Sequence, residues 1–592
     1  MPKYTPIPPR LSVSKNVQVT HSTNVNHARS ESVVSINPWN SGNIVAASKR
    51  FRELHTYDFI IEVAVSFDSG KTWAPSTLPL HRDWGVNPGM SDPTIAWDNL
   101  GWVYLFVGPH WKSNDPTDAV GNPAIGIGVW VYISKDEGRT WGTAIPISEN
   151  RDDDKQWAAS DQSSGSPHYG NVYVAWGAGT PLHFGRSQHP GTAWKGPGNK
   201  TPANSSLDLK VFGPEISVGS DGTIYIFWHN DGSDSIELVK STDGGQSFTA
   251  SKAPVVKGIK SIRTGAPTRG DWPHFPGGTF RVITLVTACV IDQKTLVVAW
   301  ADYRDGVSRI YYRRSTDGGV HWEGADGGQL LLGPAAASSS TAHEFHPQIL
   351  AMPDGTVGCA FYEFGPHYND YLTVTGGSHA RYLIDVVIAV SLDRGVHFSL
   401  RETVTERPWN PATNAPWAHG HSDVQFIGEY FGLDADKHGF RIVWTDTRTG
   451  MQELFTSKVY VQTSLSEFDP RVDSDTVYVP LHGSAGGVLI NLKTGEVIPL
   501  PYPQLNPEFR MRSQINTIRD ERVQQVAMLL EAFAIVERVS NAGAQAAMDD
   551  IVESIRMIAA QETRNREEIP KTQFPTEINS VKDGTPKSMG SE

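Results

Sequence analysis

The sequence predicts an all-β fold built from repeated units, and two features predict it. The pattern Ser-x-Asp-x-Gly-x-x-Trp/Phe occurs five times, and the segments around its copies hold alternating or continuous apolar runs bounded by Gly, Pro and Asp. A motif that returns every several tens of residues is typical of a repeat architecture. The five copies span residues 66–73, 134–141, 241–248, 315–322 and 391–398.

Each copy of the motif has the chemistry of a tight turn. In the first copy, Asp68 can accept hydrogen bonds from the backbone amides of its own turn, and Gly70 tolerates the positive φ that such a turn needs. Trp73 can fold back as a packing group. An apolar run precedes most copies, so each copy is predicted to be a hairpin turn between two strands. We interpret these Asp residues as structural.

The motif resembles the Asp-box, or BNR repeat, of sialidases and their relatives, and the resemblance covers roughly residues 25–462. It implies a β-propeller whose motif turns lie on the outer rim, away from the substrate. It also implies that the substrate lies over the central axis, at the loops that lead into the innermost strands.

The number of blades can be predicted from the pairs of strands in the sequence. An inner strand, a turn and a second strand recur at 91–107, 213–228 and 346–361. Two more units, at 166–176 and 426–444, have strands but no motif. Five units with the motif and two without it predict seven blades, with six, the number in sialidases, as the alternative. Residues 11–19 alternate like a strand and are expected to close the ring by pairing with the last blade.

The chain is expected to divide into five parts. An N-terminal arm with the ring-closing strand precedes the propeller. After the propeller, the spacing of apolar residues changes from strand-like to helical. The last part is polar and contains Pro, and it is expected to be disordered. The parts are the arm (1–24), the propeller (25–462), a small β extension (463–510), a helical hairpin or coiled-coil element (511–566) and the tail (567–592).

Bulk properties restrict the partners. The formal charge is −13 without a basic footprint, which disfavours nucleic acid, and no apolar run approaches the ~20 residues that span a membrane. Residues 1–10 lack an apolar signal-peptide core, so we expect a cytoplasmic protein or export by a non-classical route, unless a leader is missing. Cys289 and Cys359 are expected to be buried thiols.

Candidate functional residues are those just before each predicted inner strand. Acidic groups that converge there could support general acid–base chemistry, cation binding or the capping of strand ends. These entrance residues are Arg29, Glu31, Asp92, Lys155, Trp157, Glu215, Glu344, His346, Glu429 and Tyr430.

The sialidase resemblance assigns roles to some of them. Asp92 corresponds to the acid/base, and Tyr430 to the nucleophile, assisted by Glu215 or Glu429. Arg29 corresponds to the first of three substrate-gripping arginines, although its surroundings differ from the family motif. The second and third arginines have no match directly before the corresponding strands. Arg263, Arg269 and Arg281 lie in a long loop, and one of these arginines could reach the mouth of the propeller, where the inner strands begin.

Other residues are expected to line the substrate site. Glu31, Glu344, His346, Arg269 and Trp272 are the candidates, since aromatics beside charges suit a sugar-binding rim. No tight metal-ligand spacing appears, so we expect no metal in the site and no cofactor, with a structural calcium ion left open. A repeated Trp-x-Asp-x-Arg at 300–304 and 444–448 predicts structural ion pairs rather than a substrate grip.

These observations favour a sialidase-like exo-glycoside hydrolase that acts on an acidic or terminal sugar of a glycan or glycoconjugate. The alternative is a non-catalytic glycan-binding or protein-docking propeller, with residues 511–566 mediating assembly or an oligomer. A lyase or hydrolase for a uronic-acid polysaccharide is a third interpretation. The fold alone does not decide among them.

Overall fold

The computed structural model describes residues 10–461 as one compact unit, except 57, 82–83, 85–87, 112–124, 151–152, 188–192, 200–209, 270–271, 333–340, 368–380 and 420. Outside this unit it describes three strands, which pair in the order β38 (Thr476–Pro480), β39 (Gly487–Asn491) and β40 (Val497–Leu500). They fall in the predicted β extension. The predicted helical element and tail lie outside the described residues.

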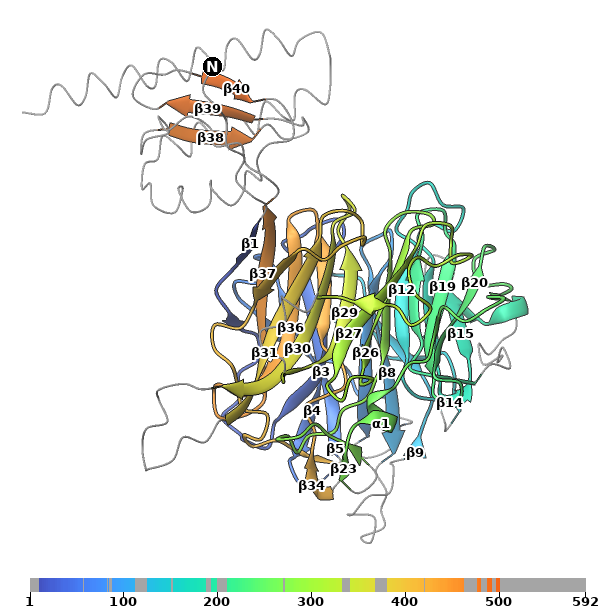
Figure 1. Cartoon of the computed structure of the whole chain (residues 1–592), viewed down its shortest axis with the longest axis vertical. Helices are drawn as coiled ribbons and strands as arrows, with labels where there is room; N and C mark the ends of the chain where they lie inside the picture. Colours follow the sequence, from blue (N-terminus) through green and yellow to red (C-terminus); the bar gives the residue numbers. More distant parts are fainter. Residues whose placement is uncertain are drawn as a thin grey trace, which may run out of the picture. The chain divides into compact units, whose positions relative to one another are not determined.

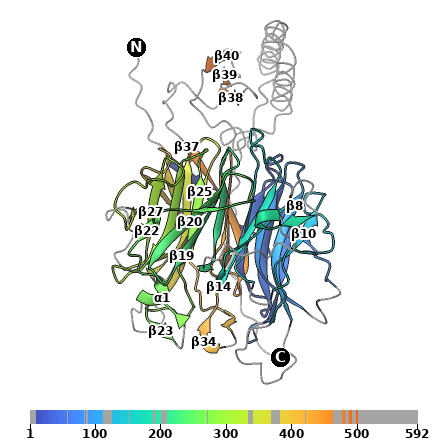
Figure 2. The same cartoon turned by 90° about the vertical axis from the view of Figure 1, so that its right-hand side faces the viewer.

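Seven antiparallel sheets surround a central axis, which confirms the seven-bladed all-β propeller (Figures 1 and 2). The first sheet contains β3 (Arg29–Ile36), β4 (Ile44–Glu53), β5 (Asp58–Ser66) and β6 (Ala74–Ser76). The second contains β7 (Gly89–Trp97), β8 (Val103–Trp111), β10 (Trp130–Ser134) and β11 (Ile145–Pro146), with β9 (Ile125–Gly126) beside β8. The third contains β12 (Trp157–Ser160), β13 (Val172–Trp176), β15 (His183–Ser187) and β16 (Trp194–Lys195).

The remaining sheets repeat this order. The fourth contains β18 (Glu215–Val218), β19 (Ile224–Asn230) and β20 (Ser235–Ser241), which pairs with both β21 (Thr249–Ala250) and β22 (Val256–Lys257). The fifth contains β25 (Val286–Val290), β26 (Leu296–Asp302), β27 (Arg309–Ser315) and β28 (Gln329–Leu330). The sixth contains β29 (His343–Ala351), β30 (Val357–His367), β31 (Arg381–Ser391) and β32 (Leu400–Thr403).

The seventh sheet closes the ring with strands from both ends of the unit. Its strands β35 (Gly432–Asp436), β36 (Gly439–Asp446) and β37 (Glu453–Gln462) are joined by β1 (Arg10–Val13) and β2 (Val17–Gln18), which both pair with β37. Asn16 ties this segment to the sixth sheet, since its side chain donates to Val404 O at 2.8 Å and accepts from Glu406 N at 2.9 Å. The predicted ring closure is confirmed. Residues 10–18 pair within the unit that spans residues 10–461.

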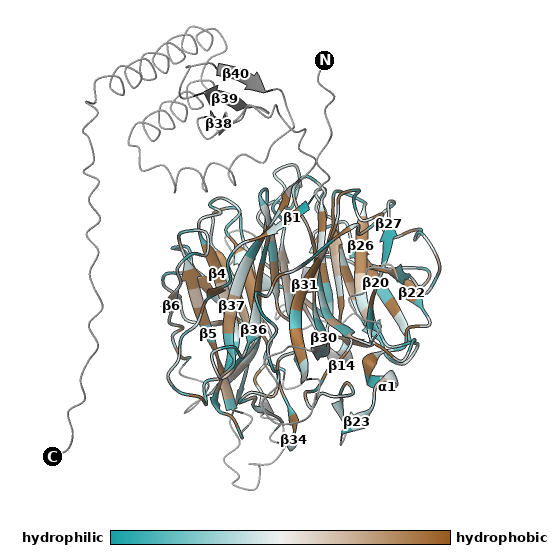
Figure 3. Cartoon of the chain, turned by 60° about the vertical axis from the view of Figure 1, so that its left-hand side comes forward, coloured by the Kyte–Doolittle hydropathy of each residue, from teal (hydrophilic) through white to brown (hydrophobic). Residues whose placement is uncertain are grey.

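The strands in the middle of each sheet are buried on both faces because neighbouring sheets pack against them. Residues 103–107 of β8, for example, are all fully buried, and hydrophobic residues run along β26 and β31 (Figure 3). This explains why these strands read as continuous apolar runs. One prediction is corrected here, because the inner strand of the third sheet is β12 and not part of 166–176.

The five motif copies form the same turn, each between the third and fourth strands of its sheet. In the first copy, Asp68 Oδ1 accepts from Lys71 N at 3.0 Å and from Thr72 N at 2.9 Å, and Gly70 has φ +77°. In all five copies the Ser hydroxyl accepts a hydrogen bond from the Gly amide, with lengths of 2.8–3.0 Å. The Asp residues therefore have a structural role, as expected for the turn.

The Trp-x-Asp-x-Arg repeats are also structural. Trp300 and Trp444 each donate their indole hydrogen to the following Asp at 3.1 Å. Arg448 pairs with Asp446 at 2.6 Å, and Arg304 pairs with Asp302 in the same way.

Several short elements lie outside the sheets. The helix α1 (Ile262–Gly265) and the hairpins β23 (Thr268–Arg269)–β24 (Trp272–Pro273) and β33 (Trp417–Ala418)–β34 (His421–Gln425) gather at one end of the propeller in both views (Figures 1 and 2). β14 (Ala178–Pro181) pairs with β17 (Lys210–Phe212), and residues 197–199 form a 3₁₀ turn. Among the described residues no helix is long and apolar enough to cross a bilayer.

Candidate functional site

Near the start of four inner strands, a residue other than glycine adopts the left-handed backbone conformation. Glu31, Asp92 and His346 have φ values of +52°, +51° and +48° and lie in irregularities of strand pairing in β3, β7 and β29. Lys155, two residues before β12, has φ +57°. Such conformations cost about 1–2 kcal/mol each. They concentrate at functional sites, where the surrounding structure holds them.

Three of these residues and Glu429 meet at a buried cluster, which we call the axial cluster. Lys155 Nζ lies 3.3 Å from Asp92 Oδ1 and 3.9 Å from Glu31 Oε1, and it also contacts the Glu429 carboxylate. The Lys155 side chain is 10% exposed and the three carboxylates 5% or less. One ammonium group therefore holds carboxylates that come from three other blades.

Two further cations complete the axial cluster. Lys49 Nζ lies 2.6 Å from Glu31 Oε2, and Arg281 Nη2 lies 2.7 Å from Glu429 Oε1. Burial opposes ionisation of Glu429, yet the charges of Arg281 and Lys155 lower its pKa to about 2. Burial raises the pKa of Glu31, against the pull of Lys49. Because these groups are buried away from water, the charged form of each one depends on its oppositely charged partner.

Tyr430 joins the axial cluster through Asp92. Its hydroxyl donates to Asp92 Oδ1 at 3.3 Å, and its ring meets the Trp157 ring edge-on at 5.4 Å. Burial, together with the nearby Asp92 and Glu31 carboxylates, raises the pKa of Tyr430 well above its usual value. The phenol is therefore protonated at neutral pH, with a carboxylate in place to accept its proton.

Asp92 also shares a hydrogen bond with the carboxyl group of Asp154. Burial and the adjacent Asp92 charge raise the pKa of Asp154 to about 7. Although burial opposes ionisation of Asp92 too, the charges of Lys155 and Lys49 hold its pKa well below the usual range. The two side chains thus form a pair with one acid and one base, the arrangement by which neighbouring carboxyl groups divide catalytic roles.

His346 is buried beside the axial cluster. It is 2% exposed, and neither ring nitrogen has a hydrogen-bond partner among the described residues. Burial lowers its pKa to about 3, so the ring is neutral at pH 7. A buried polar ring without a partner is costly and rare.

A short stack of side chains contacts the Arg281 side of the cluster. Trp272 of β24 stacks on His419 with ring centroids 4.7 Å apart and an interplanar angle of 4°. The Arg281 guanidinium lies 4.7 Å from the centre of the Trp272 ring and also contacts His419. The loops at 258–285 and 409–428 therefore position the cation that pairs with Glu429.

The structure separates the remaining predicted site residues from the axial cluster. Arg29 is buried in ion pairs with Glu62 at 2.5 Å and Glu453 at 2.9 Å. Glu344 accepts from Ile310 N at 3.0 Å. Arg269 lies 3.9 Å from Asp423 and is half exposed.

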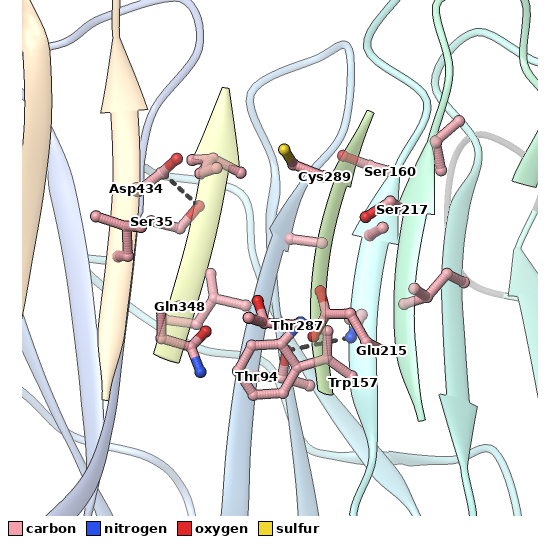
Figure 4. Close-up of a pocket in the computed structure, with 18 of the residues that line it drawn as sticks. Ser35, Thr94, Trp157, Ser160, Glu215, Ser217, Thr287, Cys289, Gln348 and Asp434 are labelled. Atoms are coloured by element: carbon pink, nitrogen blue, oxygen red, sulfur yellow. Dashed lines mark hydrogen bonds between the residues drawn. The ribbon is translucent and has the colours of Figure 1, made fainter. Parts of the chain in front are cut away.

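Glu215 lies in a channel along the propeller axis (Figure 4). This axial channel has a volume of about 290 Å³ and is lined by the inner strands of all seven sheets. Glu215 accepts a hydrogen bond from the Trp157 side chain, and burial raises its pKa well above its usual value. Asp434 accepts from Ile36 N at 2.6 Å and from Ser35 Oγ at 3.3 Å, and burial raises its pKa to about 6. The channel is therefore polar but carries little charge at low pH.

Sequence reasoning missed some members of the axial cluster. Lys155 stood among the entrance residues without a role, and Arg281 was one of three loop arginines that could reach the mouth. Lys49, in the second strand of its sheet, and Asp154 were not considered. The signal that could have found Asp154 is its place directly before Lys155, in an acidic run at 152–154.

Among the described residues, no group of three or more His, Cys, Asp or Glu side chains is arranged to hold a metal ion. The Glu and Asp side chains of the axial cluster instead surround an ammonium group.

No family model matches the chain. No curated protein matches it either. Among solved structures, a protein of unknown function from Dyadobacter fermentans is 15% identical with a TM-score of 0.41, covering 76% of this chain and 99% of that chain. The Hadza microbial sialidase Hz136 is 16% identical with a TM-score of 0.38, covering 59% and 66%. The Trypanosoma rangeli sialidase is 13% identical with a TM-score of 0.37, covering 84% of both.

Proposed function

We propose that this protein is a glycoside hydrolase, similar to sialidases in design, that cleaves a terminal sugar at the mouth of the propeller. The observation that carries the proposal is the hydrogen-bonded series Tyr430–Asp92–Asp154 beside Lys155. It places a nucleophile, a base and an acid together in one buried site. Hydrolysis of a glycosidic bond with a covalent intermediate needs all three groups.

In the proposed reaction, the Tyr430 oxygen attacks the anomeric carbon and gives its proton to Asp92. The glycosidic oxygen leaves with the proton of Asp154, whose pKa of about 7 suits a general acid at neutral pH. Water then attacks the glycosyl–tyrosine bond, gives one proton to Asp154, and Tyr430 regains its proton from Asp92. This assigns the base role to Asp92 and the acid role to Asp154, in place of the assignment that the family resemblance implies.

Two bonds of the axial cluster support this division of roles. Lys155 stabilises the ionised Asp92 at 3.3 Å, so that Asp92 can accept a proton without holding one in the resting state. Arg281 and Lys155 keep Glu429 ionised. We assign this carboxylate to stabilising the positive charge of a sugar transition state bound beside the axial cluster.

The cations of the cluster constrain the substrate. Lys49, Lys155 and Arg281 each already pair with a carboxylate. A sugar carboxylate would have to replace Glu429 at Arg281, whereas a neutral terminal sugar needs no such exchange. The substrate panel must therefore contain both kinds of sugar.

The test is hydrolysis of a panel of 4-methylumbelliferyl glycosides, neutral sugars and a sialoside included. We expect Tyr430→Phe, Asp92→Asn and Asp154→Asn each to lower kcat/KM by roughly 10²–10⁴-fold. Tyr303→Phe and Asp434→Asn are the matched controls, because both side chains lie outside the axial cluster. A well-folded protein that turns over no member of the panel contradicts the proposal, and so does full activity in Tyr430→Phe.

Burial of the cluster favours a second candidate. Asp92 is 4% exposed and Tyr430 5%, and each already has a partner inside the protein. A propeller that binds a glycan or docks to a protein without catalysis would keep such a cluster as an internal brace. The proposed assembly role of residues 511–566 belongs to this candidate. Retention on a glycan array without turnover of the panel would favour it.

A further inference from the structure

The face of the propeller opposite the axial cluster has a hollow between the first two blades. The inner strands β3 and β7 start at the axial cluster, so the turns that follow them lie at the other end. The hollow has a volume of about 520 Å³, within the range of small-ligand sites. Its lining includes Trp39, Asn40, Asn99, Leu100, Lys135 and Arg139.

Large apolar side chains are exposed around this hollow. Trp39 is 53% exposed and Leu100 is 56% exposed. Nearby, Phe67 is 41% exposed, and the guanidinium of Arg139 lies 3.8 Å from the centre of its ring. These three are among the seven large apolar residues that are exposed in the described part of the chain. Exposed apolar side chains that gather beside polar groups are typical of a binding site.

Trp39 is exposed and nevertheless fixed in position. Its indole nitrogen donates to Asp98 O at 3.2 Å, and its backbone amide donates to Asn37 Oδ1 at 3.0 Å. Asn37 donates in turn to Asn43 Oδ1 at 3.1 Å, and Asn43 reaches the second blade at Glu137 O, also at 3.1 Å. The ring is therefore held in one orientation with about half of its surface in water. Because the Trp39 side chain is already ordered, stacking a ligand on it costs little side-chain conformational entropy.

The charges of the hollow cancel. Lys135 and Arg139 face Asp136 and Glu137 in the same lining, and Arg139 pairs with Glu137 at 2.7 Å. The Lys135 ammonium lies 4.2 Å from the centre of the Trp102 ring. The amide side chains of Asn40 and Asn99 add neutral donors and acceptors. A flat apolar ring surrounded by hydrogen-bonding groups of no net charge matches a neutral saccharide.

We propose that this hollow binds a neutral saccharide, one pyranose ring of which stacks on Trp39. The axial cluster and this hollow would then be two separate sugar sites on opposite faces. The second site does not depend on the proposed hydrolase activity.

The test is an array of neutral and acidic glycans probed with the full chain, with Trp39→Ala, Trp39→Phe and Leu80→Ala. Leu80 is a matched control because it is 58% exposed and absent from the lining of the hollow. We expect Trp39→Ala to lose about tenfold or more of the signal on neutral glycans, and Trp39→Phe to lose less, because an anchoring aromatic carries much of the energy of such a site. Because the lining has no net charge, 0.5 M NaCl should leave the signal nearly unchanged.

Three results of the glycan array would overturn the proposal. They are an absence of signal on neutral glycans, a signal that Trp39→Ala leaves intact, and a signal confined to acidic glycans that disappears in salt. Light scattering on the same variants tests the rival occupant, because self-association that Trp39→Ala abolishes would assign this face to a second copy of the chain. Turnover of small methylumbelliferyl glycosides, which engage only the mouth, should be equal in wild type and Trp39→Ala.

Discussion

Tyr430 donates its phenolic hydrogen to Asp92 across 3.3 Å, although 338 residues separate the two in the chain. Asp92 belongs to the inner strand of the second blade, and Tyr430 precedes that of the seventh. Only the closed ring brings them together. The stability of the ring and the chemistry of the axial cluster are therefore linked.

Lys155→Met should destabilise the protein strongly at pH 7. The substitution leaves the Asp92, Glu31 and Glu429 carboxylates without their shared ammonium group. Breaking a buried ion pair on one side costs about 3–5 kcal/mol. Urea unfolding measures the change, and Lys135→Met, a substitution on the surface of the second blade, is the control. A loss below about 1 kcal/mol, the value of a surface ion pair, would contradict the ion-pair interpretation.

The raised pKa of Asp154 should make the free energy of unfolding fall as pH rises from about 4 to about 7. Burial and the Asp92 charge raise its pKa to about 7, so the native state holds a proton that the unfolded chain loses near pH 4. The free energy of unfolding therefore decreases with pH across that window and levels off above it. Asp154→Asn should flatten this slope in urea titrations made at several pH values.

Asp243, in the third motif copy, provides a control of opposite sign. Slight burial opposes its ionisation, but hydrogen bonds from Ser247 lower its pKa to about 2. Its stabilising contribution is present above pH 4 and is lost as pH falls toward 2. Asp243→Asn should thus change only the acid side of the profile. An unchanged slope between pH 4 and 7 in Asp154→Asn would refute the assignment of the proton.

Gly319→Ala should destabilise more than Gly306→Ala. Both glycines have positive φ, +79° and +74°. A Cβ at Gly319 would approach Leu238 Cδ2 to 2.6 Å, whereas a Cβ at Gly306 meets nothing within 4 Å. Gly306→Ala should cost only the left-handed backbone strain, about 1–2 kcal/mol. Gly319→Ala adds the clash with the preceding blade, so equal losses in thermal or urea unfolding would be inconsistent with this packing.

Asn16→Ala should weaken the closure of the ring. The side chain is 8% exposed and bridges Val404 O and Glu406 N, just after the last strand of the sixth sheet. Its removal leaves both backbone groups without a partner, which costs about 1–3 kcal/mol. Limited proteolysis near residue 404 should speed up together with the loss of stability. Lys15→Ala, an exposed neighbour, should change neither measurement.

The motif turns could be predicted from sequence because their chemistry is local. Asp68, Gly70 and the amides they contact all lie within five residues of one another. The same holds for Asp302 and Arg304. Seven blades followed once the paired strands without the motif were counted, and closure by the first strands followed from the need to cover a sheet edge.

The axial cluster could be predicted only in part, because its contacts are between blades. Position before an inner strand selected Glu31, Asp92 and Glu429 correctly as members of one cluster. The same rule selected Arg29 and Glu344, whose side chains turn toward neighbouring strands. Which way such a residue points depends on the left-handed backbone at Glu31 and its equivalents, and no local sequence signal marks that conformation.

The seventh sheet also sets the order of events during synthesis. Ser14 of the ring-closing segment bonds to Ser457, 443 residues later in the chain. At a translation rate of about 5–20 residues per second, the ribosome needs roughly 20–90 s to supply that partner. During this interval β1 and β2 lack their pairing strand, and the growing blades have an unpaired edge. A nascent chain of this protein is thus most exposed to chaperones and to aggregation just before its last blade emerges.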